Sequence, residues 1–148
     1  MPGNGILRCR GWIRLIKREH PQADQFLDAY HHEMVLAREH CVDRDLITLP
    51  LGERCRVDWL PTYLRAGTPL GLMYTSPPLE DGLESALLLT PVDPDASPER
   101  QQEHMRDNNY AFARSITLHE IYPGHHVQQL HHKLATVNSP MRRYFASP

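Results

Sequence analysis

The sequence lacks long hydrophobic runs, a charge excess of either sign, and paired cysteines. No stretch reaches the roughly twenty apolar residues of a membrane-spanning helix, so we expect no membrane span. The formal net charge of −2 gives no particular attraction to nucleic acid, and we expect no nucleic-acid partner. Cys9, Cys41 and Cys55 form no Cys-x-x-Cys pair, which argues against a disulfide framework and a cysteine zinc site.

The N-terminal segment has no signal peptide, because arginines interrupt its apolar part. We expect Ile6 to Lys17 to form a helix whose apolar stripe packs on the rest of the domain. A basic amphipathic helix that contacts a membrane or a partner is the alternative. In the absence of a signal peptide the cytoplasm is the default location, and free thiols favour a reducing compartment.

Histidine and proline are abundant, at 10 and 13 in 148 residues. The length fits a single domain, and prolines cluster from Pro50 to Pro98, which predicts a loop-rich centre. We therefore expect one partial domain over 1–148. It consists of a helical segment over 1–48, loops and a small sheet over 49–96, and motif-bearing helices over 97–148.

The apolar pattern predicts an α+β fold that is mainly helical, with a small antiparallel sheet. A helix is expected from Ala23 to Cys41, because apolar residues recur there at spacings of three and four. Ser97-Pro98-Glu99 is a good helix start, followed by a break near Asn108-Asn109. A last helix is expected over about 124–136. Strands are expected at Cys55–Trp59, Leu70–Thr75 and Ala86–Thr90, the last as an ordinary buried strand or, alternatively, an edge that pairs with a peptide.

The chemically informative segment is Leu118-His119-Glu120-Ile121-Tyr122-Pro123-Gly124-His125-His126. Zinc hydrolases use neutral imidazoles as ligands and a nearby carboxylate as general base. In the usual His-Glu-x-x-His helix the second histidine follows four residues after the first, whereas here the interval is six. On a straight helix that residue would point about 120° away from the first.

A distortion at Pro123 and Gly124 can bring the two histidines together. Proline cannot donate to the His119 carbonyl and its ring clashes with it, so the helix should bulge or kink there. We therefore predict His119 and His125 as metal ligands and Glu120 as the base, with His126 as the alternative to His125. His131 and His132 are expected on the surface.

The run His-Glu-x-Tyr-Pro-Gly-His-His-x-Gln resembles the signature of a bacterial family called domain of unknown function 885. This is a zincin-like family of candidate metallopeptidases, and the resemblance covers roughly Val57 to Phe145. It implies one zinc ion, a peptide substrate, and hydrolysis by zinc-activated water with Glu120 as base.

One departure from the family pattern concerns the third ligand. Family members carry a further glutamate in a downstream Glu-Gly-Trp segment, whereas this chain has no Asp or Glu after Glu120. Glu103, His104 or Asp107 could contribute only if the fold returns them to the motif. We therefore expect a partial, inactive metallopeptidase-like domain whose missing remainder is its partner. The alternatives are a non-catalytic binding or assembly module that retains the motif helix, and a histidine-rich metal buffer.

Overall fold

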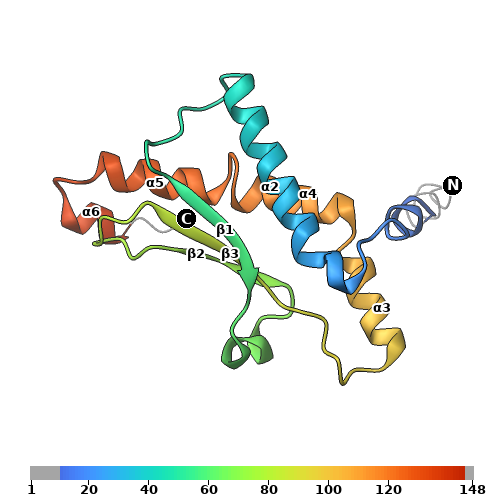
Figure 1. Cartoon of the computed structure of the whole chain (residues 1–148). Coiled ribbons are helices and arrows are strands. Elements are labelled where there is room, and N and C mark those ends of the chain that lie inside the picture. The colour runs from blue at the N-terminus through green and yellow to red at the C-terminus, as the bar shows by residue number, and fades with distance from the viewer. Residues whose placement is uncertain (1–10, 146–148) are drawn as a thin grey trace, which may run out of the picture.

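The computed structural model describes residues 11–145, in which helices pack against a small sheet (Figure 1). The α+β class expected from the sequence is confirmed. The helices are α2 (Phe26–Asp43), α3 (Pro98–Asp107), α4 (Tyr110–Glu120), α5 (His125–Ala135) and α6 (Pro140–Phe145). The strands are β1 (Arg54–Trp59), β2 (Gly71–Thr75) and β3 (Glu84–Leu89), and the short 3-10 helices are η1 (Ala23–Gln25) and η2 (Thr62–Gly67).

The sheet is mixed, with strand order β1-β3-β2. β2 pairs antiparallel with β3, as expected, but β1 pairs parallel with β3. The prediction of an antiparallel sheet is therefore wrong for this pairing. The reason is topological: β1 does not pair with the strand that follows it in sequence. The chain passes through η2, forms β2 on the far side, and returns through a turn, so β3 runs in the direction of β1.

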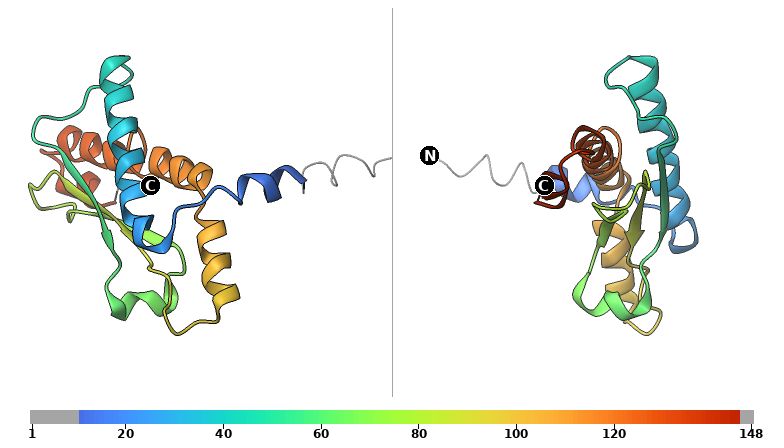
Figure 2. Two further views of the ribbon diagram at one scale, coloured as in Figure 1. Left: turned by 45° about the vertical axis from the view of Figure 1, so that its right-hand side comes forward. Right: turned by 90° about the vertical axis from the view of Figure 1, so that its left-hand side faces the viewer.

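One face of the sheet forms the core with the helices. Alternate residues of β1 and β3 point to this face. Val57 is paired there with Leu87, and Trp59 is paired with Leu89. Helix α2 packs against α4 and β1, while α5 contacts β2 and α4. Both views in Figure 2 place α3 at the end of the molecule away from the C-terminal end of α2. The segment between α4 and α5 contributes Ile121 and Tyr122 to this core.

Helix α2 follows the apolar pattern of its sequence. The predicted start at Ala23 is a 3-10 turn, and the α-helix proper begins at Phe26. The residues that recur at helical spacing are all buried: Phe26, Tyr30, Met34, Ala37 and Cys41. Burying each of the larger side chains contributes roughly 1.5–3 kcal/mol, so this stripe is sufficient to hold α2 on the rest of the fold.

The starts of α3 and α4 are both capped, and the cap of α3 is the one that the sequence predicts. The Ser97 hydroxyl accepts from the Arg100 N–H at 3.4 Å, with proline in the first turn of α3. The predicted break falls between α3 and α4, and Asn109 caps the new helix by accepting from the Phe112 N–H at 3.0 Å. These caps satisfy backbone donors that a helix start leaves free.

The N-terminal helix is described only from residue 11 onward, and the expectation for Ile6 to Arg10 lies outside the described residues. Residues 11–16 are helical, but Trp12 and Ile13 are exposed rather than packed on the domain. Within residues 11–145, no helix is long and apolar enough to cross a membrane. Cys41 and Cys55 are free thiols, and Cys9 lies in the part that is not described.

Candidate metal centre

The motif occupies the end of one helix and the start of the next. His119 and Glu120 are the last two residues of α4, and His125 is the first residue of α5. The predicted distortion at Pro123 is a complete break rather than a kink within one helix. The physical reason is the one expected: proline has no N–H for the His119 carbonyl, so the helical ladder cannot continue.

Gly124 allows the chain to fold back over the end of α4. A Cβ atom at this position would lie 1.8 Å from the His119 carbonyl oxygen and 2.7 Å from that of Leu118. No side chain fits into this space, so glycine is required here for close backbone approach rather than for an unusual φ. This approach returns the chain to His119 within six residues.

The break brings His119, Glu120 and His125 together. The two imidazole rings meet edge to face, with centroids 4.7 Å apart. One ligand-capable atom from each of the three residues lies within 4.8 Å of the others. Two donors bound to one zinc ion at about 2.1 Å lie about 3.4 Å apart in a tetrahedral site. His119 is exposed and the other two residues are half-buried.

His126 is separated from this cluster and points into the core. Its ring is fully buried, with Nδ1 2.8 Å from the Ser85 hydroxyl and Nε2 2.9 Å from the Glu53 carboxylate. Of the two histidines left open by the sequence, it is therefore His125 that lies beside His119.

The other candidate ligands lie elsewhere. His131 contacts the Thr48 carbonyl and His132 contacts that of Arg142. His104 packs edge-on against Phe26, and Asp107 pairs with Lys17. In the part of the chain that the structure describes, His119, Glu120 and His125 are the only three His, Cys, Asp or Glu residues that meet in this way.

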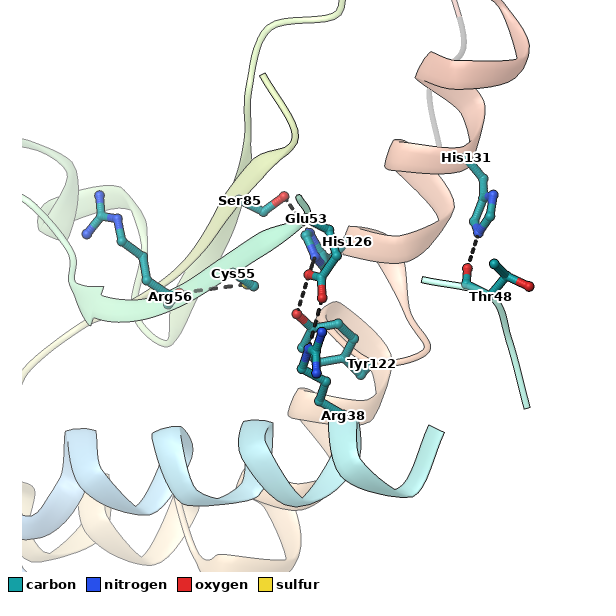
Figure 3. A network of polar contacts seen from close by, with 9 residues as sticks. All are labelled: Arg38, Thr48, Glu53, Cys55, Arg56, Ser85, Tyr122, His126 and His131. Carbon is teal, nitrogen blue, oxygen red and sulfur yellow. Dashed lines mark hydrogen bonds and ion pairs between the residues drawn. The ribbon is translucent and has the colours of Figure 1, made fainter. Parts of the chain in front are cut away.

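A buried polar network next to the motif was not predicted from the sequence. It is centred on Glu53, whose side chain is 2% exposed and which precedes β1 (Figure 3). Its carboxylate accepts hydrogen bonds from Tyr122 at 2.5 Å and His126 at 2.9 Å, and it pairs with Arg38 at 2.9 Å. Glu53 stands beside Gly52 in a polar segment that reads as an ordinary turn, so no local signal marks it.

Burial and hydrogen bonding shift the pKa values of Glu53 and His126. Burial would raise the pKa of the Glu53 carboxyl, but hydrogen bonds from its three partners outweigh burial and lower it. Burial lowers the pKa of His126, although Glu53 opposes this. The imidazole is therefore neutral near pH 7. Its Nε2–H donates to the carboxylate, and its Nδ1 accepts from the Ser85 hydroxyl.

An apolar cavity adjoins the cluster on the side of β2. It has a volume of about 140 Å³ and lies between β2, β3 and α4. Its walls include Leu72, Phe112 and Ile116, and Glu120 also lines it. The candidate base thus stands in the wall of a space suited to an apolar group.

The sequence profile of the family described as bacterial protein of unknown function, DUF885, matches residues 13–148, and the chain belongs to this family. The match begins before the resemblance noted at Val57 and so includes α2.

One solved structure gives the likeness in three dimensions. A candidate lipoprotein of unknown function from Shewanella oneidensis is similar with a TM-score of 0.71 and 20% sequence identity. The similarity covers 96% of this chain and 24% of that protein, so this chain spans about a quarter of its relative's length. No curated protein matches the chain. The cytoplasmic location expected from the sequence stays a prediction.

Proposed function

We propose that this chain carries part of the metal centre of a zincin-like metallopeptidase. His119 and His125 are the protein ligands of one zinc ion, and Glu120 is the general base. The observation that carries this proposal is the meeting of His119, Glu120 and His125, with ligand-capable atoms within 4.8 Å of one another. Two imidazoles and a carboxylate are the donor types that zinc takes in hydrolases.

Each residue has a distinct role in the proposed reaction. His119 and His125 offer neutral imidazole nitrogens, and their partial exposure leaves room for water and substrate. Glu120 accepts a proton from the attacking water and passes it to the leaving amine. A bound zinc ion supplies a Lewis acid that polarises the scissile carbonyl and acidifies water.

Two features support a peptide as the substrate. β2 is an edge strand, so its outer backbone groups are available to pair with an extended chain. The apolar cavity beside β2, with Glu120 in its wall, can take a side chain of that peptide. The alternative that Ala86–Thr90 forms the edge is wrong, because β3 pairs with neighbours on both sides and is the central strand.

The proposed centre needs a further protein ligand, because catalytic zinc sites use three. Among residues 11–145 only Glu120 joins the two histidines, and it serves as the base. We therefore assign the third ligand to the remainder of a larger domain and expect this chain alone to bind zinc weakly and to be inactive. The greater length of the Shewanella oneidensis relative is compatible with such a remainder.

Zinc titration of the full chain by calorimetry, with Co²⁺ absorption as a second readout, tests the proposal. We expect one ion per chain, with affinity lost in His119→Ala and His125→Ala. His131→Ala is the matched control, since this exposed imidazole contacts only the Thr48 carbonyl. Glu120→Gln should keep the ion if Glu120 is a base and weaken its binding if Glu120 is a ligand.

Two other outcomes would overturn the proposal. Absence of stoichiometric zinc would favour a non-catalytic binding or assembly module that retains the motif helix. Several loosely held ions that survive His119→Ala would favour a histidine-rich metal buffer.

A further inference from the structure

We propose that Glu53 is a positioning residue for the candidate metal centre. Its buried carboxylate binds Tyr122 in the linker between α4 and α5 (residues 121–124) and His126 at the start of α5, and so sets the distance between His119 and His125. This inference rests on the proposed function for its consequence, metal binding. Its structural part, the placement of the two rings, can be tested without metal.

The first support is that one oxygen atom binds both the linker and the start of α5. Glu53 Oε2 accepts from the Tyr122 hydroxyl at 2.5 Å and lies 2.9 Å from His126 Nε2. Tyr122 follows His119 by three residues, and His126 directly follows His125. Movement of α5 away from Tyr122 would therefore break one of these two hydrogen bonds.

The second support is that the carboxylate is itself anchored to α2. Its other oxygen, Oε1, accepts from the Arg38 Nε at 2.9 Å. The Ser85 hydroxyl of β3 binds the opposite nitrogen of His126 (Figure 3). The linker is thus tied to α2 and to the central strand, so the separation of the two histidine rings depends on groups distant in sequence.

Burial makes this arrangement selective for one geometry. The side chains of His126 and Glu53 are 0% and 2% exposed, so breaking the hydrogen bond between them leaves two buried polar groups without their partners, which is unfavourable. Tyr122 is also buried, and its ring packs edge-on against that of His126. A carboxylate in this position that lost its partners would be strongly unfavourable, so the linker has little freedom to slide.

Ser85, His126 and Glu53 have the composition of an acyl-transfer triad, but their surroundings argue for positioning. Ser85 is 4% exposed and lies on β3, whose backbone is paired on both sides. Its strand therefore has no free edge to provide the N–H groups that stabilise an oxyanion. The carboxylate is also engaged by Tyr122 and Arg38, as a structural anchor would be.

The test compares Glu53→Ala and Glu53→Gln with wild type in the full chain. The metal-free readout is the NOE between ring protons of His119 and His125, whose centroids lie 4.7 Å apart. The second readout is Zn²⁺ affinity. Loss of groups that orient metal ligands typically lowers affinity by about 10–100-fold. We expect Glu53→Ala to lose the NOE and to weaken binding by this factor, with Glu53→Gln intermediate, because its amide oxygen can still accept.

Glu33→Ala is the matched control. The carboxylate of Glu33 is also buried, and it accepts two hydrogen bonds from the guanidinium of Arg114 on α4, at 2.8 and 3.0 Å. It forms no hydrogen bond with the linker. Glu33→Ala should keep the NOE and the Zn²⁺ affinity. The inference is wrong if Glu53→Ala keeps both readouts, or if Glu33→Ala loses them equally.

Two safeguards separate failure of the inference from other failures. If Glu53→Ala does not fold, Glu53→Gln and Ser85→Ala decide, since each removes only part of the network and should still weaken the NOE. If wild type binds no zinc, the proposed function fails. The NOE comparison then decides the positioning role alone.

Discussion

Replacement of Gly124 by alanine is the sharpest perturbation of the linker. The new Cβ would meet the His119 carbonyl oxygen at 1.8 Å, a backbone atom that cannot rotate away. Real Cβ atoms essentially never come closer than 3.0 Å to such an atom. The backbone at residue 124 and the His119 carbonyl oxygen would therefore have to move about 1.2 Å apart. Metal–ligand distances vary by only about 0.2 Å, so this displacement should separate His125 from His119.

The expected cost of Gly124→Ala is the upper part of the roughly 1–3 kcal/mol typical of overpacking, because the clash is between backbone segments. For a chain of this size, each kcal/mol lowers the melting temperature by about 2–4 °C, so a fall of several degrees is expected. Zn²⁺ affinity should fall at least about tenfold, as after loss of a group that orients a ligand. Calorimetric melting and titration measure the two effects.

Gly67→Ala is the control, because its Cβ would meet nothing within 4 Å. It should leave melting temperature and Zn²⁺ affinity close to those of wild type. The reasoning would be refuted if Gly124→Ala melted and bound Zn²⁺ as wild type does, since the fold-back over α4 would then not limit the separation of the two histidines.

Two further predictions concern the surrounding fold. Burial lowers the pKa of His104 below its ordinary 6.5, so its imidazole binds a proton more readily in the unfolded chain. The free energy of unfolding should therefore fall as the pH drops below about 6.5. Urea titrations at several pH values should show that this free energy falls less steeply with decreasing pH in His104→Gln than in wild type. An equally steep fall in both proteins would contradict the prediction. Asn109→Ala removes the cap of α4 and should cost about 1 kcal/mol in urea unfolding, whereas Asn138→Ala, at an exposed position outside the helices, should cost little.

Local features of the fold could be predicted because they depend on neighbouring residues. The apolar stripe of α2, the Ser97 cap and the break before Asn109 each follow from residues within a few positions of one another. The end of α4 before Pro123 follows from the missing proline N–H. Such interactions are present whatever the rest of the chain does.

The parallel pairing of β1 with β3 could not be predicted in this way. Alternation of polar and apolar residues marks a strand but not its partner or direction. Direction was decided by the path through η2 and β2, which places two other elements between the paired strands. The same limitation applied to Glu53, whose three partners lie 15, 69 and 73 residues away in sequence.

The sequence by itself determined that His119, Glu120 and a following histidine stand on either side of a proline-glycine break. Only the tertiary structure decided that this histidine is His125. Ser85 and Glu53 bind His126 from distant parts of the chain and draw it into the core. Adjacent residues on a helix point about 100° apart, so burial of His126 turns His125 outward, beside His119.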